Sequence, residues 1–249
     1  VWNRIPNFGI SSVLEDKLKY AIKIGSGISS YNQLPISWIE DRVFKLKNFL
    51  MKDRGHITTL VCWLYSEKFS ITAFEKIVDK LIEPGVIGWF SGSAEFGPRA
   101  LGARSILADP RNPKAKDLLN EKIKRRESFR PFAPSILIEY VDEYFENVDM
   151  VPFMEKVFPI KPTKYNLIPA VTHVDGTGRL QTVSKEFNPR YYSLIEAFRK
   201  RTKIPILLNT SFNENEPIVD NPDQAIDCFL RTNMDMLVLE NYIVIRNNF

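Results

Sequence analysis

From Ile71 to the end of the chain, segments with a helical repeat alternate with short, almost wholly apolar segments that are bounded by glycine or proline. A helical repeat places apolar side chains three or four residues apart, whereas a short apolar run between turn residues is typical of a buried strand. Helices that alternate with such strands favour an α/β domain. We therefore predict an α/β fold class, a mixed twisted sheet with flanking helices.

The predicted elements follow from these repeats and from local turn signals. The predicted helices are 71–85, 113–124, 141–148, 189–202 and 221–232. The predicted strands are 86–92, 135–140, 204–212 and two within 236–247. A DGTG turn at 175–178 predicts a hairpin between 168–174 and 179–183. Asn112 and Asn221 each precede proline, a pair that is typical of a helix N-terminus.

Residues 1–65 have a different character. Helical repeats at 12–24 and 36–52 are separated by a break rich in glycine, serine and asparagine, and neither repeat carries a chemical motif. We predict a helical N-terminal extension, or the tail of a preceding domain, over 1–65 and a second domain over 66–249. The first residue is Val1 and not methionine, which indicates a piece of a longer protein or a processed chain.

Composition restricts the classes of partner. The 34 basic and 30 acidic residues give a net charge of +4, so the chain is only mildly basic and suits small anionic ligands as well as nucleic acid. Two cysteines without CxxC spacing favour the reducing cytoplasm, and two distant histidines build no zinc or iron site. No apolar run approaches the ~20 residues of a membrane span. We expect a soluble cytoplasmic protein without a membrane partner, to which any metal comes with a ligand.

Positively charged residues stand in an unusual context between residues 95 and 134. Arg99 and Arg104 lie five residues apart in a loop that Gly97 and Gly102 interrupt. Glycine lets the backbone approach a ligand, and a guanidinium group matches carboxylate or phosphate oxygens. Two surface arginines that brace a loop are the alternative, but their apolar neighbours favour an anion site.

Two more cations follow in this stretch. Lys124 lies beside the apolar stripe of the predicted helix 113–124, whereas Lys122 projects toward solvent on that helix. Lys124 is therefore a candidate ligand residue, with a solvated surface lysine as the alternative. Arg130 precedes Pro131, which holds it in an extended conformation.

Later candidates come from a turn and from a strand end. Arg179 follows the DGTG turn and either caps that turn or binds a ligand. Asn209 and Ser211 end a strongly apolar predicted strand, where polar groups commonly contact ligands, although a strand-capping turn is the alternative. The sequence has no phosphate-binding glycine motif, so dispersed basic side chains would hold any nucleotide.

Three long motifs occur in order: EFGPRALGARSILADPR at 95–111, FRPFAPSIL at 129–137 and NTSFNENEPIVDNPDQAIDCFLRTNMDMLVLEN at 209–241. With them, residues 70–249 resemble the C-terminal domain of the O-carbamoyltransferase family, the nodulation-factor and tobramycin carbamoyltransferases. The resemblance implies a YrdC-like fold. It also implies that this domain converts carbamoyl phosphate to carbamate and joins the carbamate to ATP, which gives carbamoyl-adenylate, phosphate and pyrophosphate.

The resemblance also assigns roles to residues and partners. It implies Arg99, Lys124 and Arg130 as catalytic residues, and Arg104, Arg179, Asn209 and Ser211 as substrate- or cofactor-binding residues. ATP is the implied cofactor, and Mg²⁺ comes with it. The family's larger N-terminal domain carries a histidine-containing iron site for transfer to the acceptor hydroxyl, and residues 1–65 do not match it. We therefore expect iron only in that domain, and expect this chain to need an acceptor-transfer domain or subunit as its partner.

Two functions of other classes compete with this interpretation. The chain could be an RNA-binding YrdC-like module or a non-catalytic interaction domain. The modest net charge argues against nucleic acid, and the intact motif residues argue against a degenerate domain. The sequence names no final acceptor.

Overall fold

The computed structural model describes residues 59–64, 71–124, 131–240 and 242–247. The chain divides into two compact units, of which Ser70–Glu240 is the larger. In the other unit, the described elements β1 (Thr59–Leu64) and β9 (Tyr242–Asn247) pair antiparallel, with Thr59 opposite Asn247. The predicted helices 12–24 and 36–52 and the predicted domain boundary after residue 65 lie outside the described residues.

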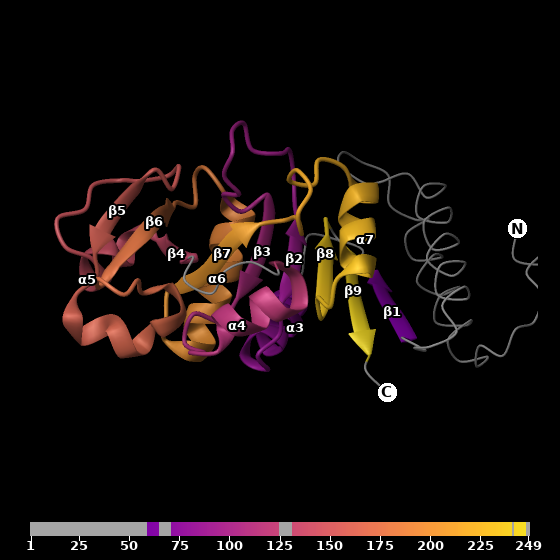
Figure 1. Ribbon diagram of the computed structural model, residues 1–249, viewed down its shortest axis with the longest axis horizontal. Helices are drawn as coiled ribbons and strands as arrows, with labels where there is room; N and C mark the ends of the chain where they lie inside the picture. The colour runs from indigo at the N-terminus through magenta and orange to yellow at the C-terminus, as the bar shows by residue number, and fades with distance from the viewer. Residues whose placement is uncertain (1–58, 65–70, 125–130, 241, 248–249) are drawn as a thin grey trace, which may run out of the picture. The chain divides into compact units, whose positions relative to one another are not determined.

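The larger unit is built on a mixed sheet (Figure 1). Its described strands run in the order β8 (Met236–Leu239), β2 (Ile87–Phe90), β3 (Arg104–Ala108), β7 (Ile206–Ser211), β4 (Ala133–Leu137), β6 (Thr177–Val183) and β5 (Lys156–Pro159). The β8–β2 and β4–β6 pairs are parallel, and the other neighbouring pairs are antiparallel. This arrangement confirms the predicted α/β class with a mixed sheet.

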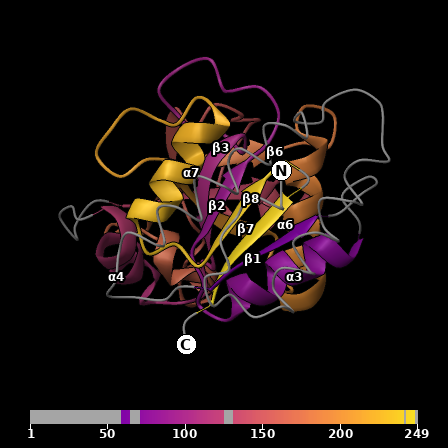
Figure 2. The same ribbon diagram turned by 90° about the vertical axis from the view of Figure 1, so that its right-hand side faces the viewer.

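Helices cover both faces of this sheet. Figure 2 shows α3 (Ile71–Ile82) and α6 (Pro189–Thr202) on one face, and α4 (Ala115–Leu119) and α7 (Pro222–Arg231) on the other. Shorter helical segments are η2 (Asn120–Lys124), η3 (Ile138–Tyr140), α5 (Val141–Tyr144), η4 (Pro162–Leu167) and η5 (Pro169–Val171). Because both faces are covered, every residue of β2, β3, β4 and β8 is buried, which explains why these strands are mostly apolar.

Of the two helix starts that were predicted from an Asn-Pro pair, the structure confirms the one at Asn221 but not the one at Asn112. The side chain of Asn221 accepts a hydrogen bond from the amide of Gln224 (3.1 Å), so the predicted N-cap of α7 is confirmed. The side chain of Asn112 instead accepts from the amide of Lys114 (3.0 Å), and α4 begins only at Ala115. The predicted helix 113–124 is therefore shorter at its start, and its second half is the π-helix η2.

The predicted hairpin at 168–183 is wrong in its first strand. Residues Pro169–Val171 form the 3₁₀ segment η5, since a proline without an N–H fits the first turn of a helix better than a paired strand. The tight turn remains, because the amide of His173 bonds the carbonyl of Thr177 (2.8 Å). The antiparallel partner of β6 is instead β5, which the sequence analysis did not predict.

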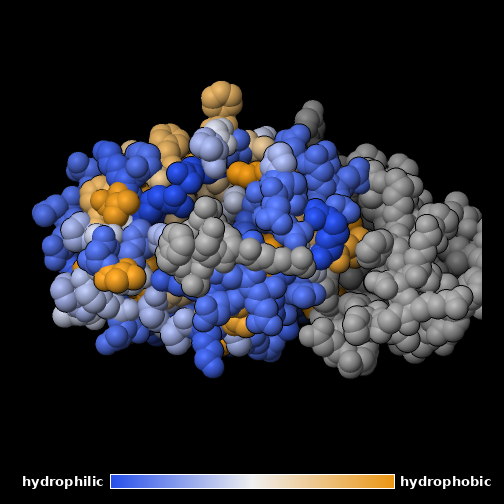
Figure 3. Space-filling model, viewed as in Figure 1, coloured by the Kyte–Doolittle hydropathy of each residue, from blue (hydrophilic) through white to orange (hydrophobic). Residues whose placement is uncertain are grey.

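On the face that Figure 3 shows, the described residues are mainly hydrophilic, with isolated hydrophobic residues. Among the exposed large apolar side chains, Phe96 and Val174 are the most exposed. Within the described part of the chain, no helix is both long enough and apolar enough to cross a membrane.

Candidate active site

One edge of the sheet collects most of the predicted site residues. Strand β7 ends at Ser211, and antiparallel β3 and β4 begin there, with Ser105 opposite Ser211 and Ala133 opposite Asn209. Strand β6 runs parallel to β4, and its register places Arg179 beside Ala133. We call this edge, where β7 ends and β3, β4 and β6 begin, the site edge. The loop 91–103, which carries Arg99, rises above it (Figure 1).

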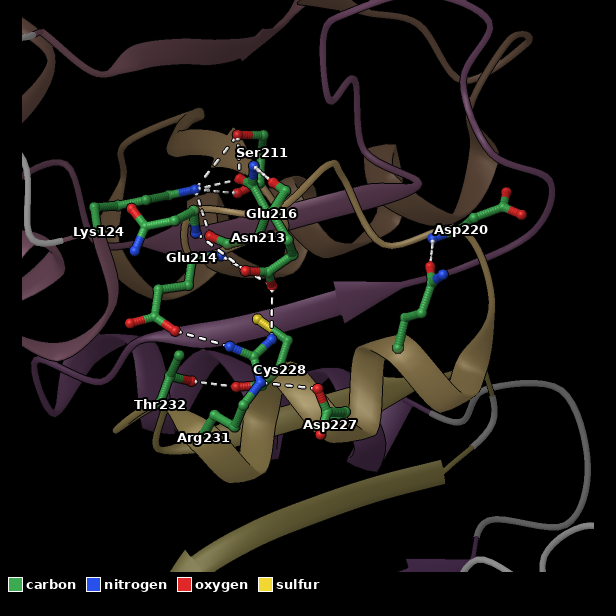
Figure 4. A network of polar contacts seen from close by, with 12 residues as sticks. Lys124, Ser211, Asn213, Glu214, Glu216, Asp220, Asp227, Cys228, Arg231 and Thr232 are labelled. Atoms are coloured by element: carbon green, nitrogen blue, oxygen red, sulfur yellow. Dashed lines mark hydrogen bonds and ion pairs between the residues drawn. The ribbon is translucent and has the colours of Figure 1, made fainter.

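Lys124 reaches the site edge from η2. Its side chain is 3% exposed, and Nζ lies 2.7 Å from the carbonyl oxygens of Ser211 and Asn213 and 2.6 Å from Oδ1 of Asn213. The first residue of β4 pairs with Asn209, so the last residues of β7 extend beyond β4 and their carbonyls remain open to the lysine. A buried ammonium group needs such oxygen partners. The structure thus brings Lys124 and Ser211 together (Figure 4).

A network of ion pairs holds the chain that follows β7 (Figure 4). Arg231 of α7 binds the carboxylates of Glu214 (2.9 Å), Glu216 (2.9 Å) and Asp227 (2.8 Å). Burial opposes ionisation of Glu216, but backbone amides and Arg231 donate hydrogen bonds to it and lower its pKa to about 2. The side-chain Nδ2 of Asn213 also donates a hydrogen bond to the Glu216 carbonyl (2.6 Å). The partners of Lys124 are therefore fixed in place.

Arg104 lies at the site edge but points away from Ser105, because adjacent residues of a strand face opposite sides. It is 5% exposed and stacks on the ring of Phe90, with its guanidinium carbon 3.5 Å from the centroid. Its nitrogens bond the carbonyls of Gly92 (2.9 Å) and Asp220 (3.3 Å). Burial lowers the pKa of Arg104, and nearby carboxylates oppose this shift. The contacts join two loops, and its predicted ligand role stays a prediction.

Asn209 is 1% exposed and does not form an open strand end. Its Nδ2 lies within hydrogen-bond distance of the Ala100 carbonyl (3.1 Å), Ser135 Oγ (3.1 Å) and Gln181 Oε1 (3.0 Å). Ser135 Oγ also donates to Gln181 Oε1 (2.6 Å). This polar row across β7, β4 and β6 ties Asn209 to the loop that carries Arg99.

Glu95 organises that loop through the backbone amides. Its Oε1 accepts hydrogen bonds from the amides of Leu101 (2.6 Å), Ala103 (2.8 Å) and Arg104 (3.2 Å). Three amides that converge on one oxygen form an anion-binding nest, and here the chain's own carboxylate occupies it. Hydrogen bonds between Glu95 and these amides therefore hold the loop in one conformation.

The carbonyls of the same loop are bonded to the surrounding strands. Trp89 Nε1 donates to the Gly102 carbonyl (2.8 Å), and Gln181 Nε2 donates to the Leu101 carbonyl (2.8 Å). Gly102 has φ = +104°, and a Cβ there would lie 2.2 Å from the ring of Tyr191. Only glycine fits this position.

Arg99 is the exposed cation of this fixed loop. It lies just before the tied Ala100, and no hydrogen bond or ion pair of its side chain is found within the described residues. The guanidinium group of Arg99 is therefore exposed to solvent, while hydrogen bonds of the loop hold the backbone next to it in place. The predicted ligand role of Arg99 agrees with this placement and stays a prediction.

Of the two other predicted site residues, Arg179 is described by the structure and Arg130 is not. Arg179 is half-buried on β6, opposite Val157 of β5. Arg130 lies outside the described residues. The structure therefore brings Lys124, Arg179, Asn209 and Ser211 to the site edge, with Arg99 above it.

Several residues at this edge were not predicted from the sequence, and one differs from its prediction. Gln181 and Ser135 carry the polar row, and the only signal for them was a polar residue within an apolar strand pattern. Glu95 gave no signal at all. Lys122 is not a solvated lysine, because its Nζ forms an ion pair with Asp235 (2.7 Å).

No group of three or more histidine, cysteine or acidic side chains within the described residues could hold a metal ion.

Comparison with known proteins places the chain in a family. Residues 78–246 match the family described as Carbamoyltransferase C-terminus, and the chain belongs to this family. Nodulation protein NolNO of Sinorhizobium fredii is 55% identical over 202 residues, which cover 78% of this chain and 30% of NolNO. Nodulation protein NolO of Bradyrhizobium diazoefficiens is 54% identical over 170 residues, 67% of this chain and 31% of NolO. The chain thus spans about a third of the length of these relatives.

A solved structure shows limited likeness. Full-length HypF in its phosphate- and nucleotide-bound form has 19% identity and a TM-score of 0.49, over 73% of this chain and 22% of HypF.

Proposed function

We propose that this chain forms carbamoyl-adenylate from carbamoyl phosphate and ATP, as the activating part of an O-carbamoyltransferase. Membership of the carbamoyltransferase family supports the transferase class. The observation that carries the finer proposal is the collection of cationic and polar side chains at the site edge, where Lys124 is buried against Ser211 and the neighbouring loop exposes Arg99.

The reaction has two balanced steps in this proposal. Water cleaves carbamoyl phosphate into carbamate and inorganic phosphate. A carbamate oxygen then attacks the α-phosphorus of ATP, the bond to the β-phosphate breaks, and carbamoyl-adenylate and pyrophosphate result. Both substrates are polyanions and further negative charge develops at the α-phosphate, so cations that are already fixed in place favour the transition state.

The predicted residues have different tasks in this scheme. Arg99, Arg130 and Arg179 bind phosphate oxygens, because guanidinium groups form paired hydrogen bonds with them. Lys124 supplies a fixed positive charge beside Ser211, whose hydroxyl contacts the ligand. Arg104 and Asn209 are buried, and they support the site by holding loops in place. Mg²⁺ comes with ATP and neutralises part of its phosphate charge.

The partner in this proposal is the remainder of a longer protein or a separate subunit. Because the chain spans about a third of NolNO and NolO, we assign transfer to the acceptor hydroxyl, and any iron, to that partner.

The purified chain, ATP, Mg²⁺ and carbamoyl phosphate together test the proposal. We expect release of both phosphate and pyrophosphate, and no pyrophosphate when carbamoyl phosphate is left out. Pyrophosphate release without carbamoyl phosphate would indicate ATP hydrolysis, and its absence with all components would refute carbamoyl-adenylate formation.

A further inference from the structure

A short chain of hydrogen bonds holds His173 in the turn before β6. His173 Nδ1 lies 3.0 Å from Thr177 Oγ1, and Thr177 Oγ1 donates to Asp175 Oδ1 (2.7 Å). The backbone fixes the same turn, because the Gly176 amide bonds the His173 carbonyl (3.0 Å) and the Thr177 amide bonds Asp175 Oδ1 (3.0 Å).

These contacts determine which imidazole nitrogen carries the proton. The threonine hydroxyl has one hydrogen, and the carboxylate of Asp175 can only accept it when ionised. The hydrogen bond from Thr177 lowers the pKa of Asp175, so that carboxylate is ionised near neutral pH. His173 Nδ1 must then donate to Thr177 Oγ1. In the neutral ring, Nε2 is left as an acceptor.

Nε2 of His173 is buried, and no hydrogen-bond partner for it is found among the residues that the structure describes. Burial lowers the pKa of His173 and so favours the neutral ring; Asp175 opposes this shift, while Lys116 and Arg179 add to it. A buried acceptor without a donor costs free energy, so it points to a group that is absent here.

Two cations, Lys116 and Arg179, are near enough to His173 to act on its charge. Lys116 Nζ bonds the carbonyl of Thr172 (3.2 Å), the residue before His173. Thr177 and Arg179 are two residues apart on β6, so their side chains leave the same face of the strand. A ligand that donates an N–H or O–H to Nε2 and carries a negative charge toward these cations would suit both features.

We propose that His173 Nε2 accepts a hydrogen bond from the NH₂ of a bound carbamoyl group whose phosphate lies beside Arg179 and Lys116. This inference rests on the proposed function and names the residue that selects carbamoyl phosphate over acyl phosphates without an amide. His173 is a specificity-determining residue in this assignment and takes no proton in the reaction. A site built to bond an N–H discriminates against a ligand that lacks it.

Two stable phosphonates test the assignment by calorimetry. Phosphonoacetamide has a –CO–NH₂ group, and acetonylphosphonate has a methyl group in place of the NH₂. One neutral hydrogen bond predicts that wild type binds the amide about threefold to tenfold more tightly. His173→Asn keeps a donor to Thr177 but removes the acceptor at the ε position. His173→Gln keeps an acceptor there and serves as the matched variant.

We expect the amide preference to disappear in His173→Asn and to persist in His173→Gln, with both melting temperatures near wild type. Three outcomes would overturn the inference: an amide preference that persists in His173→Asn, a preference that is lost equally in both variants, or no preference in wild type. In each case Nε2 would not bond the NH₂ of the ligand. Binding is measured apart from pyrophosphate release. A wild type that shows the predicted preference but releases no pyrophosphate would refute the proposed function and leave this assignment standing.

Discussion

The cations of the site differ most in how far solvent reaches them. Arg99 is exposed, whereas Lys124 and Arg104 are almost wholly buried and bonded to protein oxygens. A substitution at an exposed residue acts mainly on ligand binding, while one at a buried, bonded residue also changes stability. The two kinds of residue are therefore separated by measuring activity and unfolding together.

Arg99→Ala should lower carbamoyl-phosphate-dependent pyrophosphate release by about a hundredfold or more. The estimate takes two charge-assisted hydrogen bonds of about 1.5 to 3 kcal/mol each, with ~1.4 kcal/mol for each tenfold change. The melting temperature should not change. Arg201→Ala, which removes an exposed arginine paired with Asp79, is the control and should keep full activity. Equal activities of the two variants would remove Arg99 from the site.

Lys124→Met should lower both activity and stability. Losing the hydrogen bonds of a charged group, and leaving the Ser211 and Asn213 oxygens without a donor, should cost about 2 to 3 kcal/mol. Urea denaturation measures this loss. The exposed Lys114→Met on the same segment should unfold like wild type. A Lys124→Met protein of normal stability and activity would contradict both roles of this lysine.

The lowered pKa of Glu216 predicts a specific loss of stability in acid. Its folded pKa of about 2 lies below the ordinary 4.5, so its contribution is complete above about pH 4.5 and is lost as the pH falls toward 2. Glu216→Gln should unfold more easily at pH 6 and show a flatter pH dependence between 4.5 and 2. Urea denaturation across this range, with the exposed Glu75→Gln as control, measures the effect. An unchanged slope for Glu216→Gln would contradict the assignment.

At the scale of elements, repeats and caps were predictable, while irregular segments were not. The helices predicted at 71–85 and 189–202 and the Asn221 cap rest on local signals, and the structure confirms them as α3, which ends at Ile82, α6 and the cap of α7. The π-helix η2 depends on the contact of Lys124 with β7, and β5 depends on pairing with β6. Such distant contacts leave no periodic trace in the sequence.

The loop 91–103 offers a test of an element held by side chains. Glu95→Ala removes the acceptor of three amides, so trypsin should cut after Arg99 at least several times faster than in wild type. Glu95→Gln keeps an oxygen at this position and should resemble wild type. Cleavage rates under native conditions, read by mass spectrometry, measure the difference. The same rate in all three proteins would show that Glu95 does not hold the loop.

At the scale of the molecule, the sequence predicted where polar groups end a strand but not which groups they contact. Asn209 and Ser211 follow an apolar run, so a strand end was readable. The burial of Asn209 depends on Gln181, Ser135 and the Ala100 carbonyl, which come from distant segments. Only the folded sheet brings these groups together.

Ligand binding should stabilise the whole chain. At ligand concentrations near 100 times Kd, a site present only in the folded state adds about 2.7 kcal/mol, or roughly 5 to 10 °C in the melting temperature. Thermal shift with ATP, Mg²⁺ and carbamoyl phosphate measures this, and Arg99→Ala should show a smaller shift. A shift caused by RNA that falls steeply with salt would instead favour the nucleic-acid function.

The alternation of faces along β7 has a consequence for the length of the chain. Asn209 and Ser211 leave one face of this strand, and Leu208 and Thr210 leave the other. Deleting one residue before Asn209 within β7 would exchange the two sets, so the amide would move away from Gln181 and Thr210 would take its place. Gene libraries that vary length should therefore spare the strands and place insertions in the connections between them.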